Sequence, residues 1–165
     1  MNTNLLNQLL SEATRGNREA SYRAGKLMAN EGTFNDVAIQ KRYLDAANAG
    51  YTEAQKELGA LGLCGRLITD DATAFNIHYH TDYNNAIMWL RKAAINGDPE
   101  SKLVILAVDE FGIKVIEDAR KAVDLYRDTL CSKDLINSPT LMLFEIAMQY
   151  LDPFGVNRMN KVKTA

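Results

Sequence analysis

The residues best suited to carry out chemistry lie close together in one polar and aromatic stretch, residues 66–81. His78 and His80 are the two histidines of the chain, and Asp82 stands two positions further on. Histidine and carboxylate side chains are zinc ligands, and in an extended segment two residues at this spacing point to the same side. A zinc site commonly needs three or four ligands, however, and no second cluster of ligand residues is visible in the sequence. We therefore expect neither a metal site nor a cofactor.

Cys64 offers a second kind of chemistry, because a cysteine beside a histidine can act as a nucleophile with its general base. His78 or His80 would be that base, but no third residue that orients the imidazole can be named. The paired carboxylates Asp70 and Asp71 would need a pocket and shifted pKa values to work as acid and base. We therefore predict no catalytic residue, and we keep an enzyme or metal-binding protein that uses Cys64, His78 and His80 as an alternative.

The same stretch has a third interpretation, as a recognition element. It is rich in aromatic residues and contains Phe75, His78, Tyr79 and His80. Irregular insertions on repeat proteins often form a binding edge, whereas an elongated loop or helix extension with surface histidines is the plainer interpretation. We include these four residues among the candidate contacts to a partner.

Glycines recur along the chain in a way that predicts an internal repeat. Gly16, Gly50 and Gly97 are 34 and 47 positions apart, so the second unit carries an insertion of about a dozen residues. A glycine just past a helix adopts the left-handed conformation without steric cost. A glutamate follows each of these glycines by three positions, where the positive end of the next helix dipole favours a carboxylate.

Capping residues and apolar spacing predict that each unit is a pair of helices. Asn17 and Asp98 stand where a side-chain oxygen caps the next helix, and Pro99 fits the first helical position. Apolar residues then recur at helical spacing through each unit. We predict an all-α fold, namely an α/α superhelix or short solenoid of about three helical hairpins between terminal capping helices. The predicted boundaries are a capping helix over 1–15, repeats over 16–50, 51–97 and 98–133 with the insertion at 66–81, a C-terminal helix over 134–151 and a tail over 152–165.

The middle unit carries the most specific pattern of the chain. Its first helix contributes Ala54, Leu58 and Gly59, and its second contributes Ala86, Trp89, Lys92, Ala93 and Ala94 before the closing Gly97. This pattern resembles the Sel-one-like repeat, a relative of the tetratricopeptide repeat. The first unit matches less fully, with Arg42 where the tryptophan would stand, and the third is weaker still, so the resemblance covers about residues 16–131. It implies an α/α superhelix that acts as an adaptor or scaffold for protein complexes, often in bacteria, and some similar proteins are immunity proteins that neutralise bacterial toxins.

The first helices of successive hairpins line the concave face of such a superhelix. Their spacing places six candidate contacts on one adjoining face: Tyr22, Lys26, Lys56, Leu63, Leu103 and Glu110. We predict that this face contacts a protein partner, with an acidic or amphipathic segment against Lys26 and Lys56. Trp89, by contrast, is predicted to pack between hairpins.

Composition restricts the function further. The net charge of −2 provides no basic face for nucleic acid, and no apolar run approaches the roughly 18 residues that span a bilayer. The N-terminus lacks a secretory pattern and two cysteines make no disulfide framework, so we expect a cytoplasmic protein.

We predict a protein–protein interaction module or adaptor that binds through the concave face or the insertion. The alternative is a cytoplasmic immunity protein that neutralises a bacterial toxin; the oligomeric state is left open.

Overall fold

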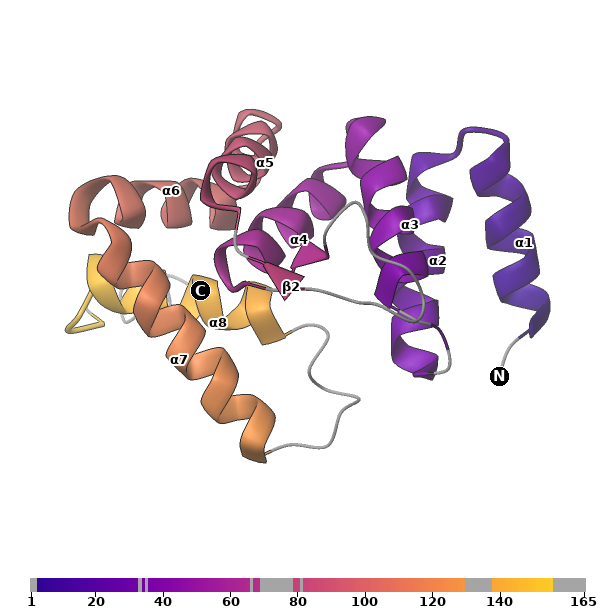
Figure 1. Ribbon diagram of the computed structural model, residues 1–165. Helices are drawn as coiled ribbons and strands as arrows, with labels where there is room; N and C mark the ends of the chain where they lie inside the picture. The colour runs from indigo at the N-terminus through magenta and orange to yellow at the C-terminus, as the bar shows by residue number, and fades with distance from the viewer. Residues whose placement is uncertain are drawn as a thin grey trace.

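Eight α-helices account for most of the residues that the computed structural model describes (Figure 1). The described residues are 3–32, 34, 36–65, 67–68, 79–80, 82–129 and 138–155. The helices are α1 (Thr3–Thr14), α2 (Arg18–Glu31), α3 (Asp36–Asn48), α4 (Thr52–Leu63), α5 (Tyr83–Ile95), α6 (Pro99–Phe111), α7 (Ile113–Thr129) and α8 (Ser138–Leu151). Two short strands, β1 (Leu67–Ile68) and β2 (Tyr79–His80), pair antiparallel between α4 and α5. Apart from this small ladder, the prediction of an all-α protein is confirmed.

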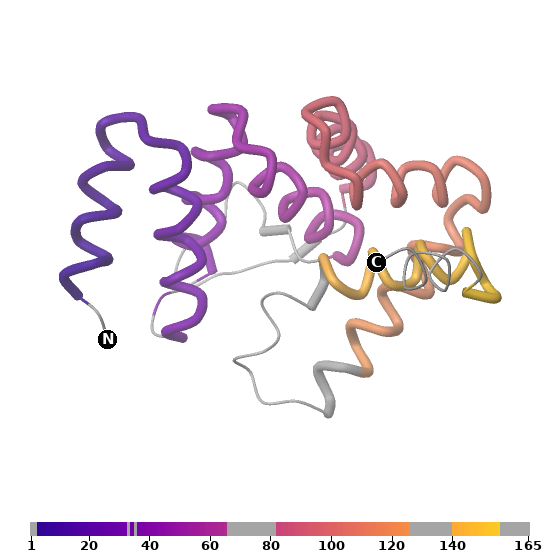
Figure 2. The backbone as a smooth tube through the Cα atoms, turned by 180° about the vertical axis from the view of Figure 1, so that it is seen from behind, coloured from indigo at the N-terminus to yellow at the C-terminus, as the bar shows by residue number. Residues whose placement is uncertain are grey.

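The predicted capping residues and glycines stand at the turns between successive helices. The side chains of Asn17 and Asp98 accept hydrogen bonds from the backbone N–H groups three residues on, over 3.1 and 2.7 Å. Gly16, Gly50 and Gly97 have φ angles of +90°, +83° and +100°, in the left-handed region predicted for them. These turns let consecutive helices pack against each other, and α1 to α4 lie in a row (Figures 1 and 2).

The hairpins α2–α3 and α4–α5 each contain an equivalent close contact between their two helices. Gly25 of α2 lies against Tyr43 of α3, and Gly59 of α4 lies against Leu90 of α5. A Cβ atom at Gly25 would come within 2.8 Å of the Tyr43 ring, and one at Gly59 within 2.5 Å of Leu90 Cγ. Both distances are far below van der Waals contact, so only glycine allows the two helices of each hairpin to approach this closely.

The third unit departs from this pattern. Gly112 alone joins α6 to α7, and α7 runs away from α6 instead of lying along it (Figures 1 and 2). Helix α8 packs against both, and it also contacts α4. Leu143 and Ala147 of α8 are buried there together with Val115 and Ile116 of α7. Helix α8 thus covers the apolar sides of α6 and α7 and also reaches back to α4; its role as the predicted end cap of a solenoid stays a prediction.

Buried apolar residues form two clusters. The first joins α1 to α4 and includes Leu58, and the second joins α4 to α8 and includes Leu63 and Leu90. Trp89 of α5 is buried in the first cluster, which confirms that it packs between hairpins. Among the described helices, none combines the length and the apolar character needed to cross a membrane.

Candidate functional site

Two residues of the predicted concave face, Tyr22 and Lys26, meet around a carboxylate of the chain itself. The Lys26 ammonium lies 3.1 Å from the Glu57 carboxylate, and the Tyr22 hydroxyl donates to the same oxygen over 3.4 Å. The Tyr22 ring is half-buried, with its centroid 5.6 Å from that of Tyr43 and 5.2 Å from that of Tyr51. The polar groups of both predicted contacts are therefore engaged within the fold.

Glu57 is the centre of this cluster, and sequence analysis missed it. Its side chain is 8% exposed, and the hydroxyl of Thr140 in α8 donates to its second oxygen over 3.0 Å. Burial raises the pKa of Tyr22 and Tyr43, and the negative charge of Glu57 raises both further. One carboxylate thus links α2, α4 and α8, so this cluster stabilises the fold.

Lys56 is also paired inside the chain. Its ammonium lies 3.1 Å from Glu100 and 3.5 Å from Asp98, at the N-terminus of α6. Burial lowers the pKa of Lys56, but the hydrogen bond to Glu100 and the charge of Asp98 outweigh it, so the pKa is raised. These contacts tie α4 to α6 and neutralise the charge predicted to attract a partner.

The remaining predicted concave residues differ in their exposure to solvent. Leu63 is fully buried in the second core cluster, and its carbonyl accepts a hydrogen bond from Arg120 Nε over 2.6 Å. Leu103 is half-buried and Glu110 is exposed. The prediction that Leu63 touches a partner is corrected by its burial, because α7 and α8 pack where helical spacing alone placed an open face.

Only part of the insertion falls within the described residues. The backbones of Tyr79 and His80 form β2, which pairs with β1, and β1 contacts α3 and α4. Phe75 and His78 lie outside the described residues. Recognition by the insertion therefore stays a prediction.

Cys64 follows α4 and is buried with a free thiol. Burial raises the pKa of this thiol to about 12, although the nearby charge of Arg120 lowers it. A thiol with this pKa is protonated at neutral pH and is a poor nucleophile. Within the ranges that the structure describes, no group of three or more histidine, cysteine, aspartate and glutamate side chains is placed to hold a metal ion.

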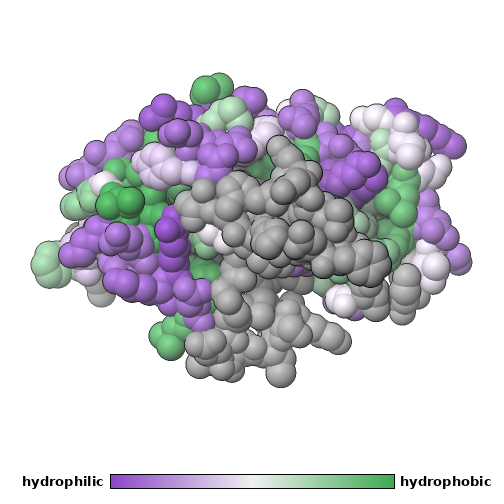
Figure 3. All heavy atoms as spheres, in the orientation of Figure 1, coloured by the Kyte–Doolittle hydropathy of each residue, from purple (hydrophilic) through white to green (hydrophobic). Residues whose placement is uncertain are grey.

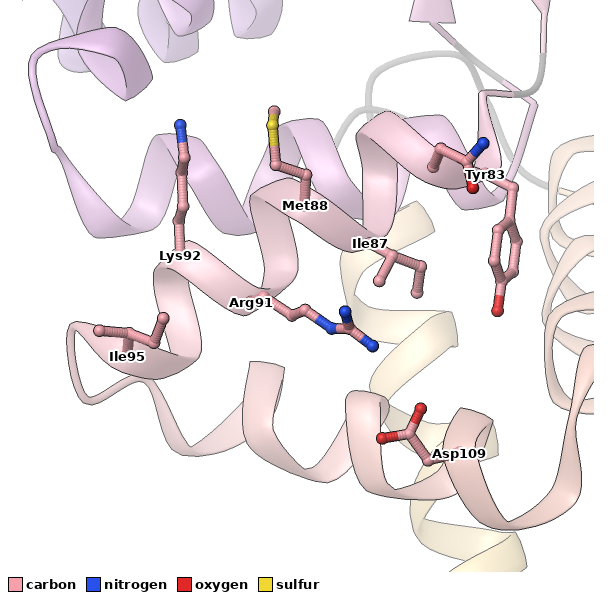
Figure 4. A pocket seen from close by; sticks show the side chains of 8 residues that line it. Tyr83, Ile87, Met88, Arg91, Lys92, Ile95 and Asp109 are labelled. Atoms are coloured by element: carbon pink, nitrogen blue, oxygen red, sulfur yellow. The ribbon is translucent and has the colours of Figure 1, made fainter.

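A hollow of about 420 Å³, the α5–α6 groove, opens beside α5 (Figure 4). One row of α5 side chains lines it with Tyr83, Ile87, Arg91 and Ile95, the next row with Asn84, Met88 and Lys92, and α6 contributes Asp109. Ile87 is buried, whereas Tyr83 is 41%, Met88 38% and Ile95 84% exposed. The spacing of four within each row is that of one helical face, so α5 presents this face to solvent except at Ile87.

Charged side chains stand among these apolar ones. Arg91 and Asp109 point from their two helices toward the same space (Figure 4). Neither has an ion pair or side-chain hydrogen bond within the described part of the chain. The Lys92 ammonium stands 4.7 Å from the centroid of the Trp89 ring, a cation–π contact.

The α5 face is open because of the course of the third unit. In a regular array the second helix of the next hairpin would lie beside α5, but α7 packs mainly on α8. Apolar side chains also reach the surface over α6 and α7 (Figure 3), where Phe111, Ile113 and Leu125 are 40, 63 and 68% exposed. Sequence analysis assigned no residue of the α5–α6 groove to a site. The sequence shows the two rows of α5 side chains, but it does not show that none of the other described helices covers them.

No known protein family, curated protein or solved structure matches this chain. The resemblance to the Sel-one-like repeat therefore rests on the residues of the middle unit. The equivalent contacts at Gly25 and Gly59 are compatible with a helical repeat in the first two units.

Proposed function

We propose that the chain is a protein-interaction module, a short solenoid of Sel-one-like hairpins that binds a protein partner through the α5–α6 groove. The observation that carries this proposal is the open face of α5, where Tyr83, Met88 and Ile95 reach solvent around the hollow. Clustered apolar side chains rimmed by charged ones are typical of protein-binding surfaces.

The helical repeat supports this choice of surface. In a solenoid each hairpin buries its apolar face against the next one. The contacts of Gly25 and Gly59 support two equivalent hairpins, and α7 does not take the position beside α5 that the second helix of a third hairpin would occupy. A helix of another chain can take that place.

The predicted concave face is a weaker candidate. Lys26 and Lys56 are neutralised by Glu57 and Glu100, and α8 already packs against α4 and α6. A partner on this side would have to break these ion pairs or displace α8. The insertion at 66–81 is kept as a second contact region.

Comparative affinity capture tests the proposal. Tagged full-length chain, the double variant Met88→Glu/Ile95→Gln and the exposed-site control Lys41→Glu are used as baits in the native cell, followed by quantitative mass spectrometry. We expect proteins that the wild type and Lys41→Glu retain and the double variant loses, and binding of the purified candidate is then measured by calorimetry.

If the wild type retains no protein above the tag alone, the chain is not a protein-interaction module. If the double variant retains the same proteins and binds the purified candidate as tightly, the α5–α6 groove is not the contact surface. A captured toxin whose lethality is suppressed by co-expression of this chain would make the protein an immunity protein.

A further inference from the structure

We infer that the α5–α6 groove receives an amphipathic helix of the partner, about three to four turns long, with an acidic side chain set in its apolar face against Arg91. This inference rests on the proposed function and specifies the chemistry of the partner at the same site. It follows from the shape of the groove, from its charges, and from the occupants that those charges disfavour.

The shape of the groove fits a helix. Its long wall is one face of α5 from Tyr83 to Ile95, which extends for about 18 Å at 1.5 Å per residue. Side chains four positions apart form a ridge, and helices pack by laying such ridges into each other's grooves. A partner helix of about 12 residues covers this length, with apolar side chains at spacings of three and four.

The charges of the groove specify an acidic partner. The lining of the groove contains two basic side chains, Arg91 and Lys92, and one acidic side chain, Asp109, so its net charge is positive although the whole chain has a net charge of −2. Lys92 points away from Asp109 and lies over Trp89, whereas Arg91 points into the space beside Asp109 (Figure 4). Covering Arg91 with apolar side chains alone would strip its water without replacing the lost interactions. A partner glutamate or aspartate at this position supplies the counter-charge, because Arg91 makes no ion pair with a described residue of its own chain.

The same charges disfavour two other occupants. A second copy of this chain, docked face to face, would bring two such basic grooves together. The last ten residues of the chain, 156–165, contain Arg158, Lys161 and Lys163 and no acidic side chain. They would meet like charges in the groove.

Selection from a displayed library of helical 16-residue peptides tests the inference on the full-length protein. The library is selected on the wild type and counter-selected on Arg91→Glu. We expect the enriched peptides to carry apolar residues at helical spacing with a glutamate or aspartate among them. The Kd of a selected peptide is then measured by fluorescence anisotropy.

Matched variants separate charge, apolar contact and folding. Arg91→Glu is expected to raise the Kd of the selected peptide about tenfold. A peptide whose acidic residue is changed to lysine should recover binding to this variant. Ile95→Gln should weaken binding without changing the thermal unfolding midpoint, because this side chain is 84% exposed. Lys41→Glu, at an exposed site on α3, should leave the Kd unchanged.

Three outcomes would overturn the inference, and they bear differently on the proposed function. If peptides bind but neither Arg91→Glu nor Ile95→Gln weakens them, the protein binds helices elsewhere and the proposed module survives without this site. If no peptide is enriched while comparative capture still finds a groove-dependent partner, the partner is not a helix of this chemistry. If sedimentation finds a wild-type dimer that Arg91→Glu dissociates, a second copy occupies the groove instead.

Discussion

Glu57 offers a quantitative test of how the helices are held together, because three of them share its carboxylate. It accepts hydrogen bonds from Lys26 of α2 and Thr140 of α8 over 3.1 and 3.0 Å, and its side chain is 8% exposed. Removing one partner of a buried ion pair costs about 3–5 kcal/mol, because the other charge loses its compensation. The Lys26 side chain is 23% exposed and can regain part of its hydration, so Glu57→Ala should lower the free energy of unfolding by about 2–3 kcal/mol.

Two further variants separate charge from shape. Glu57→Gln keeps the length of the side chain and one acceptor oxygen, so it should cost about half as much. Lys26→Met leaves the Glu57 carboxylate buried without this ammonium, so this variant should also lower the free energy of unfolding. The double variant Glu57→Met/Lys26→Met should cost less than the sum of its single changes by about 1–2 kcal/mol, because an apolar pair leaves no uncompensated charge.

Urea unfolding followed by circular dichroism measures these differences, with comparison of the slopes as well as the midpoints. Lys41→Met, which removes an exposed lysine of α3, is the control and should change the free energy of unfolding by less than about 0.5 kcal/mol. A loss below about 0.5 kcal/mol for Glu57→Ala, or strict additivity in the double variant, would show that this carboxylate does not join the helices.

Three other predictions concern helix contact, the buried thiol and the docking of α8. Gly59→Ala should destabilise by about 1–3 kcal/mol despite the better helix propensity of alanine, because its Cβ would overlap α5; calorimetry would contradict this with a raised melting temperature. Burial raises the pKa of Cys64 to about 12, while an unfolded thiol titrates near ~8.5. The unfolded state therefore loses its proton first and stability falls as the pH rises between these values, a loss that should be smaller in Cys64→Ala when urea midpoints at pH 8 and 10 are compared. The Tyr150 hydroxyl, 2.7 Å from Asp118, lowers the pKa of that carboxyl, so its stabilising contribution is present above the unfolded pKa and is lost as the pH falls through the lowered value. An NMR titration should find the pKa of Asp118 higher in Tyr150→Phe, and an unchanged value would contradict the assignment of this hydrogen bond as the cause.

Local structure was predictable because it depends on near neighbours in the chain. The side-chain oxygens of Asn17 and Asp98 reach N–H groups only three residues away, and the left-handed conformation of Gly50 depends on its own lack of a Cβ. The helical spacing of apolar residues likewise identified the side of α5 that is buried at Trp89. For the same reason the all-α class and the left-handed turns at Gly16, Gly50 and Gly97 followed from sequence patterns.

The fate of the predicted concave residues was not predictable, because their contacts are with residues far away in the sequence. Lys26 and Lys56 lie on an exposed helix face when each helix is considered alone. Their partners Glu57 and Glu100 stand 31 and 44 positions further along the chain, and spacing within one helix contains no information about them. The placement of Leu63 in the core depends in the same way on α7 and α8.

The sequence by itself thus determined that the chain is helical, where several of its turns and caps stand, and which residues of each helix are apolar. Tertiary structure decided which of those apolar residues are covered. The chain direction after Gly112 places α8 against α4 and α6, and the described helices leave the face of α5 beside Arg91 exposed. The physical reason is that capping and dihedral preferences act over a few residues, whereas the burial of a face is the sum of contacts with every element that packs against it.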